Sequence, residues 1–304
     1  MNKFFDLSLL HPRNWLTWLG LGVLWLLVQL PYPLLHIIGS SLGRAARPFL
    51  KRREKIAARN IALCFPEMNA ADKETLLEQN FVSLGMGLIE TGMAWFWSDA
   101  RVKKWFDVEG YANLTNALAE NRGVMVVGVH FMSLELGGRA MGLCRPMMAT
   151  YRRHNSPLME WVQTRGRLRS NKAMIDRRNL RGLVQALKAG EAVWFAPDQD
   201  YGPKGSTFAP FFSVPQAATT NGTRVLSRLS GAGLLTITMV RKANRRGYSL
   251  HISESITDYP KEDELAAASY MNRVIEKEIL RAPEQYLWVH RRFKTRPLGE
   301  ASLY

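Results

Sequence analysis

The chain has 304 residues, of which 47% are hydrophobic and 22% are charged. This composition excludes an intrinsically disordered protein and leaves room for one large α/β domain with an appendage, or for two modest domains. With 41 Lys and Arg residues against 26 Asp and Glu residues, the formal net charge is +15, so we expect anionic partners: a nucleic acid, an anionic membrane surface or an acidic protein.

An apolar segment near the N-terminus favours the membrane. Residues 14–43 contain no Asp, Glu, Lys or Arg, and their core, WLTWLGLGVLWLLVQL at 15–30, is slightly shorter than the roughly 20 residues of a straight spanning helix. Pro31 and Pro33 should break or kink a longer helix, so a single span and a helix that dips into one leaflet both stay open. No A-x-A cleavage site follows, which argues against a signal peptide. We predict a membrane anchor at residues 1–43; a buried soluble helix is the alternative.

A basic cluster follows this anchor. Only Glu54 opposes its seven cationic residues, which are Arg44, Arg47, Lys51, Arg52, Arg53, Lys55 and Arg59. Because positively charged flanks stay on the cytoplasmic side, we expect the rest of the protein to be cytoplasmic, with the cluster against anionic headgroups. Nucleic acid is the weaker partner, since no zinc-finger, RRM or Gly-rich RNA motif is present. The two cysteines, Cys64 and Cys144, lack zinc-site spacing and are predicted to be small buried residues.

Beyond the cluster, the spacing of Leu, Phe and Ile residues predicts a helix at 71–97. Strands and helices then alternate. Predicted strands lie at 124–129, 147–151, 192–196, 234–240 and 248–253, and predicted helices lie at 133–142, 156–169, 179–188, 217–230 and 262–281. Strands separated by helices form βαβ units, so the predicted fold is α/β, with a mixed, largely parallel sheet flanked by helices.

Polar side chains follow two of these strands. His130 comes directly after the strand at 124–129, and Asp198 follows the strand at 192–196. Ligands of such sheets bind beyond the carboxyl ends of the strands, which makes these residues a candidate site. A neutral imidazole can remove a proton from an attacking hydroxyl if a carboxylate fixes its tautomer. Glu135, predicted in the first turn of the next helix, is the expected partner of His130 across the strand-to-helix turn.

The same region predicts direct acyl transfer. No G-x-S-x-G nucleophile elbow is present, so the substrate is expected to supply the attacking hydroxyl. A developing oxyanion then needs cationic or N–H donors, and the run RGRLRSNK offers four candidates, which are Arg165, Arg167, Arg169 and Lys172. Asp198 and Asp200 have no further acidic or histidine residues clustered with them, so neither a metal nor a cofactor is expected. A structural histidine and a solvated arginine face are the competing interpretations.

Six long segments resemble the late lipid A biosynthesis acyltransferases of Gram-negative bacteria, a branch of the H-x4-D/E glycerolipid acyltransferases. They extend from near residue 11 to the C-terminus and read HPRNWLTWLGLGVLWLLVQLPYP, ETGMAWFWSDARVKKWFDVEG, VGVHFMSLELGGR, WVQTRGRLRSNKAM, AVWFAPDQDYGPKGS and APEQYLWVHRRFKTRP. Within the family, the stretches RVKKWFDVEG, PMMATYR and PDQDYG are more similar to members that transfer palmitoleoyl chains than to those that transfer lauroyl chains.

The resemblance implies an acyltransferase domain at 44–304, held on the cytoplasmic side of the inner membrane by the N-terminal anchor. The implied donor is a fatty acyl thioester on acyl carrier protein. The implied acceptor is Kdo-bearing lipid IVA, on which a hydroxyl of a 3-hydroxyacyl chain is acylated. Carried over to this sequence, His130 is the general base and Glu135 its partner, and Arg167 and Asp198 are also functional.

Other functions stay open at this point. They are lauroyl transfer to the same acceptor, acyl transfer to a different lipid, and a non-catalytic membrane adaptor that recruits acidic partners through its basic faces. The C-terminal run HRRFKTRP is a further basic patch. We expect Arg291 and Arg292 in this run to help dock the headgroup of the acceptor.

Overall fold

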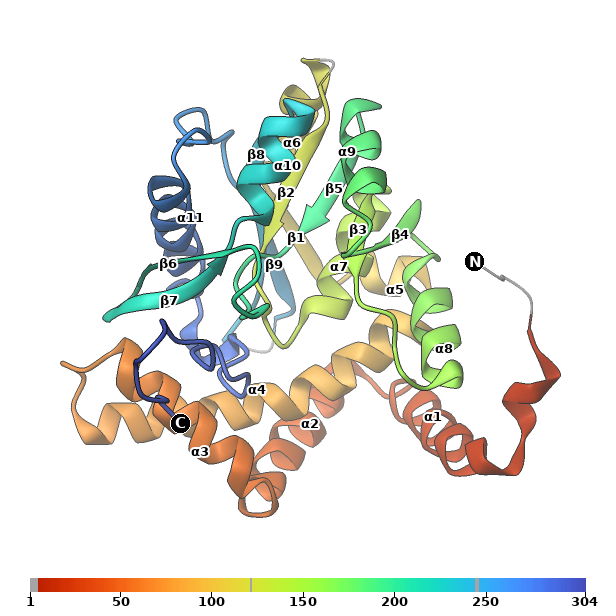
Figure 1. Cartoon of the computed structure of the whole chain (residues 1–304). Helices are drawn as coiled ribbons and strands as arrows, with labels where there is room; N and C mark the ends of the chain where they lie inside the picture. Colours follow the sequence, from red (N-terminus) through yellow and green to blue (C-terminus); the bar gives the residue numbers. More distant parts are fainter. Residues whose placement is uncertain (1–4, 121, 244–245) are drawn as a thin grey trace.

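The computed structural model describes residues 5–120, 122–243 and 246–304. Its centre is a seven-stranded sheet (Figure 1). In spatial order the strands are β1 (Phe106–Glu109), β9 (Tyr248–Ile252), β8 (Gly233–Arg241), β2 (Val124–Gly128), β5 (Ala192–Phe195), β3 (Met148–Tyr151) and β4 (Ala173–Asp176). Only β8 and β9 pair antiparallel within this sheet, so the predicted α/β fold with a mixed, largely parallel sheet is confirmed.

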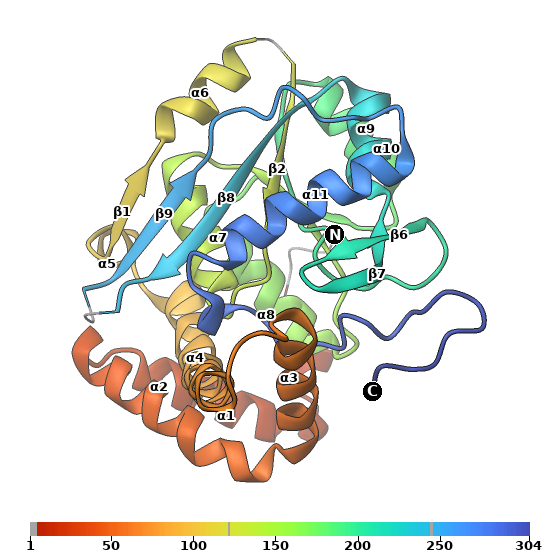
Figure 2. The same ribbon diagram turned by 90° about the vertical axis from the view of Figure 1, so that its left-hand side faces the viewer.

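Helices cover both faces of the sheet, as the apolar run of β2 requires. Met125 and Val127 of β2 belong to the core that includes α11, whereas Val124 and Val126 belong to the core that includes α7. In Figure 2, α11 crosses in front of the sheet and α7 lies behind it. The helices after β1 are α6 (Tyr111–Ala119), α7 (Leu134–Cys144), α8 (Pro157–Arg167), α9 (Leu180–Lys188), α10 (Gly222–Ser230) and α11 (Glu264–Ile279).

The long helix α4 (Ala70–Phe96) runs beneath the sheet (Figure 1). It matches the helix predicted at 71–97. Its first turn is capped by Asn69, whose side-chain oxygen accepts a hydrogen bond from the backbone N–H of Asp72. On one side α4 carries the N-terminal helices; before it lies α3 (Lys51–Cys64), and after it the short α5 (Asp99–Lys103) leads to β1.

The N-terminal apolar segment forms two helices, α1 (Trp15–Leu27) and α2 (Tyr32–Ala46), which separate at Pro31 as predicted. At 1.5 Å per residue each helix is about 20 Å long, against roughly 30 Å of bilayer hydrocarbon. Among the residues that the structure describes, no helix is both long enough and apolar enough to cross a membrane. The membrane anchor predicted at residues 1–43 stays a prediction.

Helix α2 lies directly against α4. Glycines allow the close approach, because a Cβ added to Gly85 of α4 would lie 2.2 Å from the carbonyl oxygen of Gly39 in α2. The link between α1 and α2 is also fixed, since Trp97 Nε1 donates to the carbonyl of Val28 at 2.7 Å. The proposed division of the chain at residue 43 stays a prediction.

Two other predictions from the sequence, one about residues 217–220 and one about Cys144, were wrong. Residues 217–220, predicted as the start of a helix, belong to strand β7 (Val214–Thr220), which pairs antiparallel with β6 (Ser206–Phe211). Pairing with β6 overrides the local preference, and α10 begins only at Gly222. Of the two cysteines predicted to be buried, Cys64 is buried but Cys144, the last residue of α7, is exposed.

Candidate active site

The two predicted strand-end residues meet. Strands β2 and β5 are parallel neighbours, so the chain leaves both at the same edge of the sheet. His130 Nδ1 lies 2.6 Å from Asp198 Oδ1, and the backbone N–H of His130 donates to Asp198 Oδ2 at 2.9 Å. Asp198 is fully buried, whereas the His130 side chain is 19% exposed and a substrate can reach its ring.

Asp198 is held as an anion although it is buried. Burial alone would raise the pKa of its carboxyl group, but the positive charge of protonated His130 and the hydrogen bonds that His130 donates lower that pKa below its usual value. A carboxylate can only accept hydrogen bonds, so Nδ1 of neutral His130 carries the ring proton and Nε2 keeps its lone pair. Trp194 packs edge-on against the ring at a centroid distance of 5.9 Å. This is the arrangement of a general base and its orienting carboxylate.

The prediction that Glu135 is the partner of His130 was wrong. Glu135 lies in the first turn of α7 and pairs with Arg167, the last residue of α8. Arg167 Nε donates to Glu135 Oε2 at 3.1 Å, and Arg167 Nη2 donates to the other carboxylate oxygen. Gln163 Nε2 adds a contact of 3.3 Å. The start of α7 faces the end of α8, while the neighbouring strand brings Asp198 directly to the imidazole.

Of the four predicted cations, only Arg167 pairs with Glu135, and Arg165 lies over the ring of Trp161. The Arg167 side chain is 21% exposed within its ion pair. Arg169 instead donates to the carbonyls of Trp95 and Trp97, at 2.5 Å and 2.9 Å, and so stabilises the end of α4. Lys172 contacts both carboxylate oxygens of Glu191, at 2.8 Å and 2.6 Å, in a largely exposed ion pair.

A cavity of about 100 Å³ is lined by Glu135 and Arg167. His130 and Asp198 are not among its lining residues, but Trp194, which packs against the His130 ring, is one of them. Val129 and Phe131, the residues on either side of His130, contribute to its wall, and Glu135 and Arg167 form a charged part of it. Most of the remaining wall is apolar and includes Trp95, Met141, Met147, Met174, Trp194 and Met239. Arg139 is a further charged residue of the wall. A cavity with a few charged groups in a mainly hydrocarbon lining fits a ligand that is itself part polar and part aliphatic.

The segment that follows the short 3-10 helix at Pro283–Gln285 fixes the loop that carries His130. The backbone N–H of Leu287 donates to the carbonyl of His130 at 3.1 Å, and that of Met132 donates to the carbonyl of Gln285 at 2.8 Å. The Gln285 amide in turn accepts from the backbone N–H of Arg241 at 2.8 Å and donates to its carbonyl at 2.9 Å. The end of β8 therefore supports the loop that carries His130 through one side chain.

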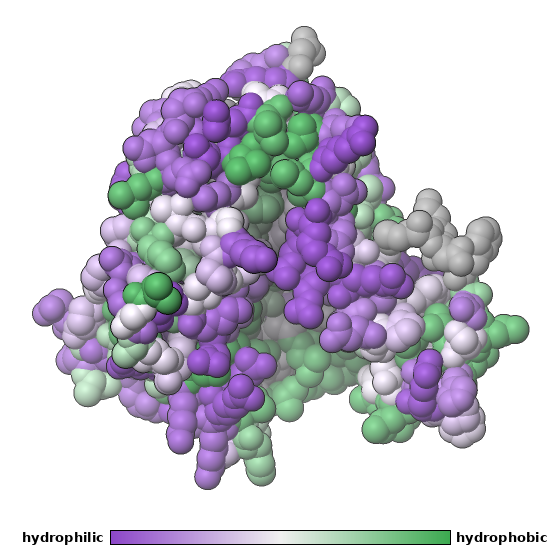
Figure 3. Space-filling model, in the orientation of Figure 1, coloured by the Kyte–Doolittle hydropathy of each residue, from purple (hydrophilic) through white to green (hydrophobic). Residues whose placement is uncertain are grey.

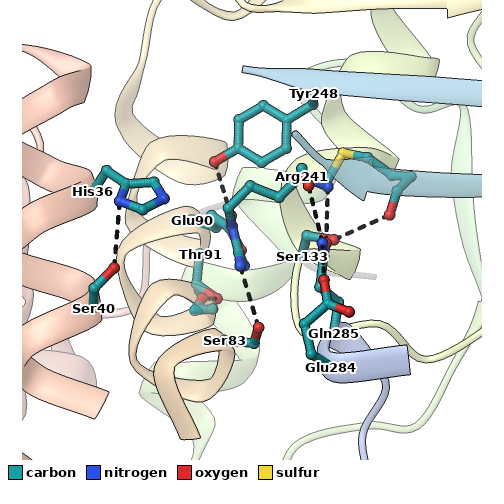
Figure 4. Close-up of polar contacts among 12 residues, drawn as sticks. His36, Ser40, Ser83, Glu90, Thr91, Ser133, Arg241, Tyr248, Glu284 and Gln285 are labelled. Atoms are coloured by element: carbon teal, nitrogen blue, oxygen red, sulfur yellow. Dashed lines mark hydrogen bonds and ion pairs between the residues drawn. The ribbon is translucent and has the colours of Figure 1, made fainter. Parts of the chain in front are cut away.

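Arg241 is itself held by a buried ion pair that sequence reasoning missed (Figure 4). Its Nε and Nη2 atoms donate to the two carboxylate oxygens of Glu90, at 2.7 Å and 3.0 Å, and the Tyr248 hydroxyl donates to the same carboxylate at 2.8 Å. Burial, followed by the nearby Glu90 charge, raises the pKa of Tyr248 well above its usual value, so the phenol stays protonated. The one available signal was a lone carboxylate within the apolar run LIETGMAWF of α4.

The C-terminal basic patch differs from its predicted role. Arg292 is only 2% exposed; it donates to the carbonyl of Ala218 at 2.7 Å and lies over the ring of Phe211. A side chain so buried cannot dock a headgroup, and the expectation for Arg292 was wrong. Arg291 is half-buried, with its guanidinium 4.9 Å from the ring centroid of Tyr304.

Similarity to known proteins extends over nearly the whole chain. Residues 2–295 match the family described as "Bacterial lipid A biosynthesis acyltransferase". The "Lipid A biosynthesis palmitoleoyltransferase" of Escherichia coli K12 is 71% identical over 99% of this chain and 98% of its own length, and the "Lipid A biosynthesis lauroyltransferase" of the same strain is 52% identical over the same shares. A solved 1-acyl-sn-glycerophosphate acyltransferase from Thermotoga maritima covers 86% of this chain and 95% of that chain at 18% identity, with a TM-score of 0.38, too low to establish a shared fold.

Proposed function

This chain belongs to the bacterial lipid A biosynthesis acyltransferase family, and from that premise we propose that it transfers a palmitoleoyl chain from acyl carrier protein to a hydroxyl of a 3-hydroxyacyl chain on Kdo-bearing lipid IVA. The observation that carries the proposal is the His130–Asp198 pair, whose neighbours Val129, Phe131 and Trp194 line a largely apolar cavity. The net charge of +15 complements an acidic carrier protein and an acceptor that bears phosphates and carboxylates. Palmitoleoyl is favoured over lauroyl because the identity to the palmitoleoyltransferase is higher.

The proposed reaction begins with proton removal by His130. Its Nε2 takes the proton of the acceptor hydroxyl while the hydroxyl oxygen attacks the thioester carbonyl carbon. When the tetrahedral intermediate collapses, the new C–O bond remains, the C–S bond breaks, and the imidazolium returns its proton to the leaving thiolate. Asp198 stabilises the imidazolium between these steps. Because the attacking oxygen belongs to the acceptor, no acyl-enzyme forms.

Arg167 is the proposed source of positive charge at the reacting carbonyl. A guanidinium has five N–H donors, and the contacts with Glu135 use two of them. The others can donate to the thioester oxygen as negative charge develops on it. Glu135 then acts through Arg167, as a positioning residue that holds the guanidinium plane.

The experiment that tests this function is acyl transfer by the purified protein in detergent. The acceptor is Kdo-bearing lipid IVA, and the donors are acyl carrier protein thioesters from decanoyl to palmitoyl, saturated and unsaturated, with products read by mass spectrometry. We expect palmitoleoyl to be transferred fastest. Faster transfer of lauroyl would show that lauroyl, and not palmitoleoyl, is the preferred acyl chain. Absence of transfer from every donor would contradict the proposed enzyme and favour the non-catalytic membrane adaptor.

We also propose that the protein lies on the cytoplasmic side of the inner membrane, with α1 and α2 in the plane of the interface rather than across it. Apolar side chains gather over these helices along the lower edge in Figure 3. Those with large exposed fractions include Trp15, Leu16, Leu19, Val23, Leu26, Leu34 and Ile37. The basic cluster that begins at Arg44 directly follows, where it can contact anionic headgroups.

Replacing Leu16, Leu19 and Leu26 together with glutamine should weaken binding to vesicles of phosphatidylethanolamine and phosphatidylglycerol. These side chains are 80%, 64% and 63% exposed in α1, so the fold does not depend on burying them. Loss of three apolar contacts with lipid should lower the partition coefficient by at least about a hundredfold. Flotation of the vesicles measures the bound fraction.

The matched control replaces three exposed leucines outside α1 with glutamine: Leu229, Leu265 and Leu280, which are 50%, 53% and 57% exposed. This variant should float with the vesicles as the unmodified protein does. Equal flotation of the α1 variant, or equal losses in both variants, would contradict the proposed membrane face.

A further inference from the structure

A second and much larger cleft lies beside the cavity that Glu135 and Arg167 line, which is called the catalytic cavity below. It has a volume of about 1280 Å³ and is bordered by α1 and α8, which lie one above the other at the right of Figure 1, and by the end of α4. Pockets for drug-sized ligands are typically about 300–1,000 Å³. The cleft therefore has room for a ligand much larger than one fatty acyl chain.

Aromatic side chains form much of its wall. They come from three elements: Trp18 and Trp25 from α1, Trp95 and Phe96 from α4, and Trp161 from α8. Trp18 and Trp161 contact each other edge to face, with ring centroids 6.1 Å apart, and so join α1 to α8 at one part of the cleft wall. Such walls favour aliphatic chains and the apolar faces of rings.

The charges in the cleft favour an anionic ligand. Among the described residues, Arg153 and Arg165 have no carboxylate partner, and Arg165 lies over the ring of Trp161 at 5.4 Å. The two acidic side chains in the wall are already hydrogen-bonded to backbone N–H groups: Asp6 accepts from Ser8 at 2.9 Å, and Glu160 accepts from His154 at 2.8 Å. The cleft thus offers unpaired positive charge beside an aromatic wall.

The cleft adjoins the cavity that Glu135 and Arg167 line. Trp95 and Gly166 line both spaces, so the wall between them is a single layer of residues. At this point α8 approaches α4 so closely that a Cβ on Gly166 would lie 2.4 Å from Trp95 Cδ1. The next residue, Arg167, belongs to the catalytic cavity. A ligand in the cleft is therefore one residue away from the proposed reacting groups.

Helix α1 separates this cleft from the proposed membrane face. Leu16 and Leu19 lie on its exposed side, whereas Leu21, Gly22 and Trp25 contribute to the cleft. A lipid leaving the bilayer beside α1 would enter the cleft without passing through water.

We propose that the α1–α8 cleft is the binding site for the anionic, multiply acylated glycolipid acceptor, entered sideways from the bilayer. The assignment rests on the proposed function, and it makes α1 a part of the substrate site in addition to a means of membrane attachment. The aromatic wall packs against the acyl chains and sugar rings of the acceptor, and Arg153 and Arg165 contact its anionic groups.

Two glycines of α1 allow a matched test. A Cβ added to Gly22 or to Gly20 meets no atom within 4 Å, and only Gly22 belongs to the cleft wall. The residues are two apart, so their side chains would leave the helix on nearly opposite sides. Both glycine-to-leucine changes favour the helix, which makes loss of folding an unexpected outcome.

Gly22→Leu should raise the KM for Kdo-bearing lipid IVA about tenfold, because the new side chain occupies the cleft. The KM for palmitoleoyl-acyl carrier protein should change less than twofold, and Gly20→Leu should leave both values unchanged. Binding of the acceptor without donor, followed by tryptophan fluorescence of the full-length protein in detergent, should weaken by the same factor in Gly22→Leu only.

These measurements test the cleft assignment separately from the proposed acyl transfer. An unchanged acceptor KM and binding constant in Gly22→Leu, or a raised donor KM instead, would overturn the cleft assignment. Equal effects of Gly20→Leu would also overturn it. The unmodified protein could bind the glycolipid more tightly than Gly22→Leu does and yet transfer no acyl chain. In that case the proposed function fails and the cleft assignment stands.

Discussion

Replacing Asp198 with asparagine should lower the turnover number of acyl transfer by a thousandfold or more, on the order of the loss seen when the carboxylate of a catalytic triad is made an amide. The carboxylate contacts both the ring and the backbone N–H of His130. An asparagine amide keeps the shape but can place an N–H donor against Nδ1, which stabilises the wrong tautomer of the imidazole. It also removes the negative charge that stabilises the imidazolium.

The assay is steady-state acyl transfer with circular dichroism to check folding. Glu191→Gln is the matched control, because it neutralises a carboxylate in the surface ion pair with Lys172 and should change turnover less than about twofold. A loss below tenfold in folded Asp198→Asn would show that the carboxylate does not orient the base.

The second large effect concerns stability. Arg241→Met leaves the Glu90 carboxylate buried without its cation, since Glu90 is 0% exposed and Arg241 only 7% exposed. Breaking one side of such a pair costs about 3–5 kcal/mol of the free energy of unfolding. We expect a loss of this size in urea unfolding followed by circular dichroism.

Two further variants identify the cause. The double variant Glu90→Gln and Arg241→Met should be more stable than Arg241→Met alone, because no lone charge stays buried. Arg178→Met, which breaks an exposed ion pair with Asp176, should cost less than about 1 kcal/mol. If Arg241→Met unfolds no more easily than Arg178→Met, the buried pair does not stabilise the fold.

The central strands could be predicted from the sequence because both of their faces are buried. β2, VMVVG, is buried at every position, so it reads as an unbroken apolar run. The edge strands β1 (FDVE) and β4 (AMID) are only four residues long and contain no fully buried residue, which leaves no such pattern. Residues 217–220 of β7 are predicted as helix, because the pairing of β7 with β6 is a tertiary contact that local preference does not encode.

The site could be predicted in part for a related reason. The rule that ligands bind at strand ends selected His130 and Asp198 together. Choosing the partner of His130 required the order of the strands, because Asp198 is 68 residues away and only the β2–β5 pairing makes it a neighbour. Glu135 was favoured by its closeness in sequence, and the approach of α8 that gives it Arg167 had no local signal.

The most direct test of the central claim is a double-mutant cycle on His130 and Asp198, measured as single-turnover transfer of palmitoleoyl to Kdo-bearing lipid IVA. If the carboxylate acts only through the imidazole, His130→Ala alone should lose at least as much as Asp198→Asn, about a thousandfold or more, and adding Asp198→Asn should cost almost nothing more. Losses that multiply, or a His130→Ala variant within tenfold of the unmodified protein, would contradict proton removal by a His130 ring that Asp198 holds in place.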